Sequence, residues 1–233
     1  MTASPTPLVL LPGLLCDAEL WRDTIADLGA TVAPQVPDLT LDDSLGAMAE
    51  RVLAGAPPRF ALVGLSMGGY VAFEIMRRAP ERVSRLALID TSASPDSAQR
   101  AGRREAALEE LGIGRFAGVT GRLLPRLVHP KHVDGPVGAR VRAMAERVGA
   151  EAFLRQQRAI LDRPDFRPGL GAIRVPTWVA VGDADVLTPP AEAREIYLGI
   201  PTATLHTFTD CGHLPPLEQP AETGRFLARW LLG

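Results

Sequence analysis

The sequence Gly64-Leu65-Ser66-Met67-Gly68-Gly69 separates an apolar run at 60–65 from a helical pattern that begins at Tyr70. Glycines on both sides of the serine remove side chains that would collide where a strand turns sharply into a helix. In such a turn the serine backbone is strained and its hydroxyl stands above the edge of the sheet. A Gly-Ser-Gly cluster alone would indicate only a turn, but the strand before it and the helix after it favour a serine presented for chemistry.

Other apolar runs in the chain are short, bounded by Pro, Gly or Asp, and not alternating, which is typical of strands buried on both faces of a parallel sheet. Helical patterns lie between them, with candidate N-caps at Asp17 and Ser44 and a candidate stop at Gly55. Since parallel strands need crossover connections, we predict an α/β fold with helices on both faces of the sheet. The predicted strands are Leu8 to Leu11, Phe60 to Leu65, Leu86 to Ile89, Thr177 to Val181 and Thr204 to Phe208.

The chain changes character twice. Residues 1–94 and 167–233 have the strand and helix pattern of one core, and the second part contains predicted helices at 191–197 and 221–231. Residues 95–166 have no convincing strand and are rich in Arg, Ala, Glu and Leu at helical spacing. We therefore predict a helical insertion that acts as a cap, or lid, over a site at the carboxyl ends of the strands.

Composition limits the class of protein. The chain has 233 residues, 46% of them hydrophobic, which is enough for one globular domain with a sizeable core. Its formal net charge is -2, with acids and bases interspersed, so we expect no nucleic-acid partner. Residues 1–7 do not have the pattern of a signal peptide and no apolar run approaches the length of a membrane span, so we expect no membrane partner and a cytoplasmic location.

The two cysteines, Cys16 and Cys211, lack metal-ligand spacing and are too few for a disulfide framework. We predict that both are reduced and pack as small apolar side chains. A redox-sensitive pair is the alternative, because the predicted fold brings the two loops that contain them to the same edge of the sheet.

A serine hydroxyl is a poor nucleophile at neutral pH and needs a histidine base, which in turn needs a carboxylate to orient it. His129 and His132 lie in the predicted insertion and His206 lies in a predicted strand, where structural roles are expected. His213 lies in a loop between the last strand and the last helix, and it is the candidate base for Ser66.

The segment 182–190 offers two candidate carboxylates, Asp183 and Asp185. With either one, the chain order is Ser, Asp, His, which is the order expected when a serine follows this kind of turn. The other aspartate is then a candidate cap for the helix that begins near Pro190. We favour Asp185, because it lies three residues beyond Gly182, where the loop leaving the strand has room to turn toward the histidine loop, whereas Asp183 is closer to the strand end.

At these motifs the chain resembles the α/β-hydrolase family, in particular its small capped serine esterases and lactonases. The resemblance implies that Ser66 is the nucleophile, His213 the general base and Asp185 its partner, since the family's Gly-x-x-Asp motif counts from Gly182. The matching segments are Gly64 to Gly69, Pro80 to Val83, Leu86 to Asp90, Gly182 to Asp185, and Gly212, His213, Glu218 and Pro220.

The resemblance also implies an oxyanion hole made by the backbone N–H groups of Leu14 and Met67. Many members of the family have His-Gly after the first strand, whereas this chain has Pro12 and Gly13, but a backbone donor does not require the histidine. The first predicted strand follows almost at once from Met1. We therefore expect a mostly parallel sheet of about six strands, two fewer than is usual in the family.

The resemblance implies a hydrolase that cleaves a small-molecule carboxylic ester through an acyl-enzyme on Ser66, with neither a metal nor an organic cofactor. An enol-lactone hydrolase, an acyl-carrier methyl esterase, a thioesterase, a menaquinone-pathway-type lyase and a cofactor-free haloperoxidase are alternatives on the same core. The non-enzyme alternative is a binding protein with the same fold. The charged segment 100–110 is predicted to be a solvated helix face, with an anion-binding lid as its alternative.

Overall fold

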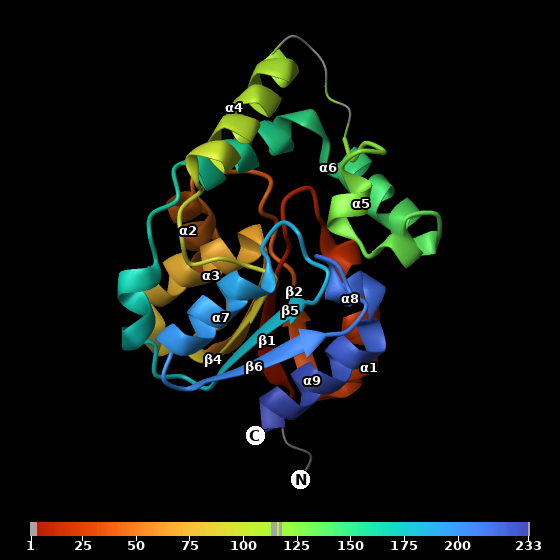
Figure 1. Ribbon diagram of the computed structural model, residues 1–233. Helices are drawn as coiled ribbons and strands as arrows, with labels where there is room; N and C mark the ends of the chain where they lie inside the picture. The colour runs from red at the N-terminus through yellow and green to blue at the C-terminus, as the bar shows by residue number, and fades with distance from the viewer. Residues whose placement is uncertain (1–3, 113–115, 117, 233) are drawn as a thin grey trace.

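A computed structural model of the protein describes residues 4–112, 116 and 118–232. Its strands form one sheet in the order β2-β1-β3-β4-β5-β6, and every neighbouring pair is parallel (Figure 1). The predicted α/β class and the sheet of about six parallel strands are thus confirmed. The strands are β1 (Thr6–Leu11), β2 (Val32–Gln35), β3 (Phe60–Leu65), β4 (Val83–Ile89), β5 (Thr177–Gly182) and β6 (Ala203–Phe208).

Helices cover both faces of this sheet (Figure 1). Helices α1 and α9 pack together on one face, and α2, α3 and α7 cover the other. In the described part of the chain, no helix is long and apolar enough to cross a membrane. The α-helices are α1 (Arg22–Leu28), α2 (Leu45–Gly55), α3 (Met67–Arg78), α4 (Ala98–Gly112), α5 (Leu124–Leu127), α6 (Pro136–Leu161), α7 (Pro190–Gly199), α8 (Pro215–Glu218) and α9 (Pro220–Leu232). The 3-10 helices are η1 (Ala18–Trp21), η2 (Gly29–Thr31), η3 (Pro80–Arg82), η4 (Pro130–His132) and η5 (Arg167–Ala172).

Both predicted N-caps form. Ser44 Oγ accepts a hydrogen bond from the Ala47 N–H at 3.2 Å and starts α2, which ends at Gly55 as predicted. Asp17 Oδ1 accepts from the Glu19 N–H at 2.9 Å, but the element it caps is the 3-10 helix η1, and α1 begins only after it. A side-chain oxygen at either position satisfies an N–H that the first turn of a helix leaves free.

Strand β2 has no counterpart among the strands predicted from sequence. It is four residues long, only Val32 is buried, and Pro34 interrupts it. Proline has no N–H to donate to a ladder and is tolerated on an edge strand, which is where β2 lies. A strand with one buried side chain has too weak an apolar signal to be recognised.

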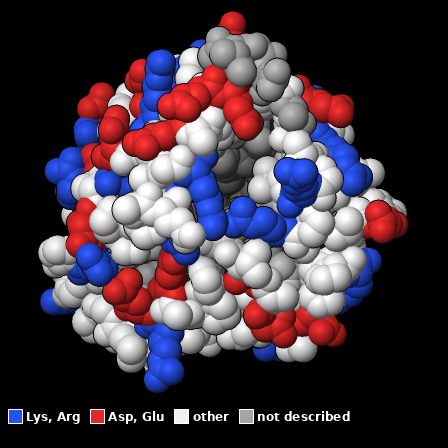
Figure 2. Space-filling model, turned by 45° about the horizontal axis from the view of Figure 1, so that its top comes forward, with Lys and Arg blue, Asp and Glu red and all other residues white. Residues whose placement is uncertain are grey.

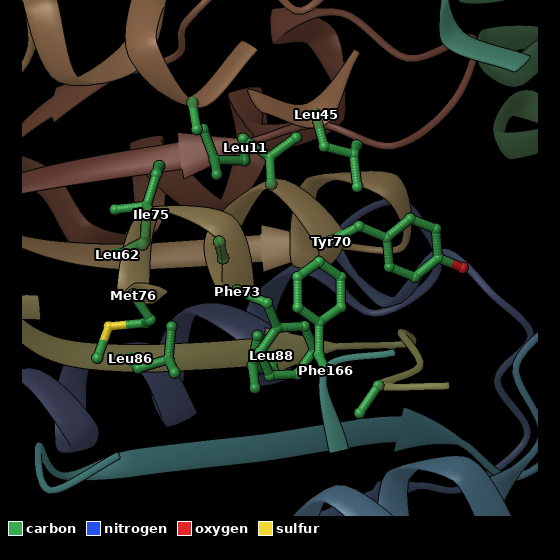
Figure 3. Close-up of a cluster of buried hydrophobic side chains, with 14 of the residues drawn as sticks. Leu11, Leu45, Leu62, Tyr70, Phe73, Ile75, Met76, Leu86, Leu88 and Phe166 are labelled. Atoms are coloured by element: carbon green, nitrogen blue, oxygen red, sulfur yellow. The ribbon is translucent and has the colours of Figure 1, made fainter. Parts of the chain in front are cut away.

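The apolar cluster between the sheet and helices α2 and α3 is tightly packed (Figure 3). The rings of Phe73 and Phe166 stack with centroids 5.2 Å apart, so α3 is joined to a segment that follows α6. Tyr70 belongs to the same cluster, and its hydroxyl points away from it (Figure 3). The Tyr70 side chain thus connects the core to the cavity described below.

Helices α4, α5 and α6 lie at the top of the molecule in Figure 1, in the segment between β4 and β5. Helix α6 is kinked at Gly149, whose φ of 77° is readily adopted only by glycine. Before the kink, Val141 and Met144 pack into the cluster that contains α1 and α9, and after it Ala159 and Ile160 pack into the cluster of Figure 3. The kink therefore lets one helix contact the cores on both faces of the sheet.

Candidate active site

The turn from β3 into α3 places Ser66 at the carboxyl end of the sheet with φ 54° and ψ -115°. This conformation is unfavourable for a residue with a side chain. The flanking glycines are required by close backbone contacts: a Cβ on Gly64 would lie 2.5 Å from the Gly68 carbonyl oxygen, and a Cβ on Gly68 would lie 2.3 Å from that of Leu11. The Thr91 hydroxyl donates to the Ser66 carbonyl at 2.8 Å, which fixes the turn from the β4 side.

Ser66 lines a cavity of about 700 Å³, a volume suited to a small molecule. The cavity lies where the strand order reverses, between the loops that follow β1 and β3, which is where parallel sheets commonly bind ligands. Gly13 and Leu14 contribute one wall, His213 another, and helices α4 and α6 the side away from the sheet. Figure 2 shows the hollow in this face of the molecule.

His213 is buried and paired with Asp185, since its Nδ1 lies 2.7 Å from Asp185 Oδ2. A carboxylate bound to Nδ1 holds the proton on that nitrogen and leaves Nε2 free to accept one. Asp185 is itself fixed by its neighbours, because it accepts hydrogen bonds from the Leu187 N–H at 2.8 Å, the Thr188 N–H at 3.2 Å and the Thr188 hydroxyl at 2.7 Å.

Burial alone would raise the pKa of Asp185, but the charge of His213 and its hydrogen bond outweigh that effect and bring the pKa to about 2. Asp185 is therefore ionised at neutral pH. Asp183 is exposed, and its carboxylate accepts the backbone N–H groups of Asp210 and Cys211, each at 3.1 Å. Helix α7 begins after Pro189 without a side-chain cap, so the capping role considered for either aspartate does not occur.

Asp90, the last residue of the family-matching segment Leu86 to Asp90, is a third carboxylate at this site. It follows β4, is fully buried, has φ 43°, and accepts the Gly182 N–H at 2.9 Å. Donor atoms of Asp90, Asp185 and His213 all lie within 4.8 Å of one another. Burial, and then the charge of Asp185, raise the pKa of Asp90 well above its usual value. The hydrogen bond between Asp185 and His213 occupies two atoms that a metal ion would need.

Glu218 anchors the loop that contains His213. Its carboxylate accepts backbone N–H groups on either side of that histidine, from Gly212 at 3.0 Å and Leu214 at 3.0 Å, and also from His129 at 2.7 Å. The His213 N–H donates to the Leu127 carbonyl at 3.0 Å. The spacing of Gly212, His213 and Glu218 in the sequence was the available signal for this arrangement.

The two predicted oxyanion donors belong to the loop after β1 and to the start of α3. Leu14 lines the cavity in the loop after β1, where an added Cβ on Gly13 would lie 3.4 Å from Ser66 Cβ. Met67 is the first residue of α3, a position whose N–H has no partner within the helix. Among the described residues, no hydrogen bond joins Ser66 Oγ to His213 Nε2, a contact that in many enzymes tightens only when substrate is bound.

The other histidines lie away from Ser66 and Asp185. The His206 ring packs against Phe226 with ring centroids 3.7 Å apart, and its Nε2 lies 3.2 Å from a Glu222 oxygen. His129 Nδ1 accepts the Lys131 N–H at 3.4 Å, and burial lowers the pKa of His132. These contacts agree with the structural roles expected from the sequence.

Both cysteines are free and buried. Burial raises the pKa of Cys16 to about 12 and that of Cys211 further still. Because the thiolate is the reactive form, neither side chain has the character of a redox-sensitive thiol.

Comparison with known proteins agrees with this geometry. A model of the alpha/beta hydrolase family matches residues 8–225. The pimeloyl-[acyl-carrier protein] methyl ester esterase of Aromatoleum aromaticum is 30% identical, with 92% of this chain and 94% of that protein covered. Among solved structures, a thermophilic esterase from Thermogutta terrifontis has a TM-score of 0.88 at 28% identity, covering 99% of this chain and 91% of that one.

An enol-lactonase from Burkholderia xenovorans has a TM-score of 0.84 over 98% of this chain and 92% of its own, and at 23% identity it shows the same fold. A family model that spans most of the chain, and a relative aligned over nearly its whole length, thus agree with the motifs and with the sheet topology. The protein belongs to the alpha/beta hydrolase family.

Proposed function

We propose that the protein is a carboxylic ester hydrolase in which Ser66 is the nucleophile, His213 the general base and Asp185 the partner that orients the histidine. The observation that supports this most strongly is the buried Asp185–His213 pair, which faces the same cavity as a serine in a strained strand-to-helix turn. The esterase relatives support acyl transfer from an ester, and the cavity volume suits a small-molecule substrate.

In this proposal His213 Nε2 takes the proton of Ser66 Oγ as that oxygen attacks the ester carbonyl carbon. The N–H groups of Leu14 and Met67 stabilise the oxyanion that develops. His213 then returns the proton to the departing alcohol oxygen, which leaves an acyl-enzyme. Water attacks the acyl carbon, His213 takes its proton and returns it to Ser66, and the carboxylic acid is released. Asp185 stays ionised throughout and stabilises the imidazolium.

Neither a metal nor an organic cofactor is required by these steps. A serine at the turn forms an acyl-enzyme, whereas halide displacement and epoxide opening in this family use aspartate. We also propose that residues 95–166 act as the cap of the enzyme, because helices α4 and α6 supply the cavity wall opposite the sheet. Residues 1–94 and 167–233 would then be the two parts of the hydrolase core.

A fluorophosphonate probe and a panel of chromogenic short-chain esters test the proposal. We expect the probe to label Ser66, and Ser66→Ala to lose both labelling and turnover while it melts cooperatively like the wild type. Removal of a triad member reduces turnover by about 10⁴ to 10⁶ in studied hydrolases. Ser94→Ala is a matched control, because it is the same substitution at another serine that lines the cavity and takes no part in the proposed chemistry. Normal turnover by a well-folded Ser66→Ala protein, after host esterases are removed, would contradict the assignment.

A further inference from the structure

The cavity above Ser66 has more positive than negative side chains in its walls. The chain as a whole has a formal net charge of -2, so this excess is local. Four arginines and two carboxylates line the cavity, an excess of two positive charges. These side chains are Arg100, Arg103, Arg104, Arg126, Asp96 and Glu192.

The two carboxylates are already paired. Arg100 Nη2 lies 2.5 Å from Glu192 Oε1, and Arg104 Nε lies 2.6 Å from Asp96 Oδ2. Asp96 is shared with a further arginine, the fully buried Arg163, whose Nη2 lies 3.0 Å from Asp96 Oδ1. Both carboxylates are therefore already paired with other arginines, and neither balances the charge of the remaining two arginines of the cavity.

Those two, Arg103 on α4 and Arg126 on α5, are exposed and make no ion pair or side-chain hydrogen bond with any residue in the described ranges. Because they come from different helices, they approach the cavity from separate elements of its wall. Figure 2 shows basic side chains beside the hollow. A guanidinium without a protein partner offers paired N–H donors in the geometry that fits a carboxylate or phosphate.

The acidic side chains outside the cavity indicate that an anion bound by these arginines is a small molecule. Further along α4, Glu105, Glu109 and Glu110 are exposed, and Figure 2 shows acidic side chains gathered near the hollow. An acidic macromolecule lying across this face would meet these carboxylates, and like charges at an interface are unfavourable. A small anionic group that enters the cavity meets only the arginines of its walls.

We propose that the enzyme selects small esters that carry an oxyanion, a carboxylate or a phosphate, at a distance from the ester bond. Arg103 and Arg126 bind this oxyanion while the ester carbonyl lies at Ser66. The inference rests on the proposed function and narrows its substrate class. Arg103 and Arg126 are specificity determinants in this arrangement and take no part in the bond-breaking steps.

Matched pairs of substrates test the inference. The monomethyl esters of linear dicarboxylic acids of graded length are compared with methyl esters of the same length that end in a neutral carboxamide, and a phosphate-ended ester forms a third arm. We expect kcat/KM to favour an anionic ester of the preferred length by about tenfold or more over its carboxamide. Either the carboxylate or the phosphate arm supports the proposal.

Arg103→Gln and Arg126→Gln should each reduce this preference by about two- to fivefold, the range expected for one exposed ion pair, and the double variant should remove most of it. For the carboxamide substrates, which carry no charge for these arginines to bind, kcat/KM should change less than for the anionic substrates. Arg122→Gln is the matched control, because Arg122 is exposed nearby but does not line the cavity. Added salt should reduce the preference of the wild type and leave the double variant unchanged.

Equal kcat/KM for both members of every pair, or a preference that survives in the double variant, would overturn the inference. So would a gain seen only when the ester is attached to an acyl carrier protein, since that result assigns the recognition to a macromolecule. A direct binding measurement covers the case in which no ester of the panel is turned over: dicarboxylates should slow fluorophosphonate labelling of Ser66 more than the matching diamides. Turnover that persists in Ser66→Ala counts against the proposed function instead, and so the two failures are distinguishable.

Discussion

Asp185→Asn changes one atom at the centre of the proposed catalytic pair. In the wild type, Asp185 Oδ1 accepts the N–H groups of Leu187 and Thr188, and Oδ2 faces the Thr188 hydroxyl and His213 Nδ1. An asparagine can keep its oxygen toward the two N–H groups and place its NH₂ where Oδ2 was. The Thr188 hydroxyl can rotate to accept from that NH₂, so the loop should keep its shape.

His213 has no such freedom, because an NH₂ group opposite Nδ1 requires Nδ1 to accept. The proton then moves to Nε2, and the imidazole can no longer take a proton from Ser66. We expect kcat to fall by about 10⁴, which is about 5 kcal/mol of lost transition-state stabilisation. Steady-state hydrolysis of a chromogenic ester measures the loss, and circular dichroism with a thermal melt verifies the fold.

Asp183→Asn is the matched control. It is the same substitution two residues away, on an exposed side chain that accepts backbone N–H groups and does not contact His213. We expect turnover within a few-fold of the wild type. Asp90→Asn belongs in the same series, since Asp90 also lies beside His213. A folded and nearly active Asp185→Asn protein, beside an Asp183→Asn or Asp90→Asn variant that has lost most of its turnover, would overturn the assignment of Asp185.

Three further predictions concern stability. Gly68→Ala should lower the free energy of unfolding in urea by about 3 kcal/mol or more, because the added Cβ would lie 2.3 Å from the Leu11 carbonyl oxygen. Gly102→Ala lies in open space on α4 and should raise the free energy of unfolding by up to about 1 kcal/mol. Similar effects of the two changes would contradict the geometry of the turn. Ser66→Gly should raise Tm by about 3 °C, because glycine adopts a φ of 54° without strain, whereas Ser66→Ala should not raise it. Equal melting temperatures for the two variants would argue against strain at this position. Burial opposes ionisation of Asp185, but its partners lower the pKa from 3.8 to about 2, so its contribution of about 2 kcal/mol should be present above pH 4 and lost as the pH falls through 2. Chemical denaturation of wild type and Asp185→Asn at several acidic pH values measures this, and a difference that does not shrink on acidification would be the contrary result.

Much of the sheet could be predicted from sequence because its central strands are buried on both faces. Every residue of β3 is buried, so an apolar run was sufficient to predict it. Strand β2 was missed since it is an edge strand with one buried residue, and its pairing with β1 supplies what its side chains do not. Element boundaries elsewhere differ from the predicted ones by one to three residues, as in β4, which begins at Val83.

The candidate site could be predicted only in part. Ser66 and His213 each lie in a local motif, whereas Asp183 and Asp185 lie in the same loop and only their distance from Gly182 favoured Asp185. The structure supplies the physical difference, because Asp183 faces the end of β6 and Asp185 faces His213. Asp90 ends a segment that resembles the family, but its contact with Asp185 depends on β4 and β5 being neighbours in the sheet, a pairing that no local pattern encodes.

A buried glutamine of α6 makes hydrogen bonds to two loops of the core. Gln156 of α6 accepts the Leu15 N–H through Oε1 at 3.1 Å and donates Nε2 to the Leu39 carbonyl at 3.2 Å. Leu15 lies next to the proposed oxyanion donor, and its φ of 59° is held in place by that contact. Suppose that this helical segment is exchanged for that of a relative to change the substrate preference. The Leu15 N–H and the Leu39 carbonyl would then lose their partner, unless the new segment also has a side-chain amide at position 156. Chimaeras that keep Gln156 should express and fold where those that replace it with an apolar residue do not, which makes this glutamine the first constraint on any redesign of the enzyme.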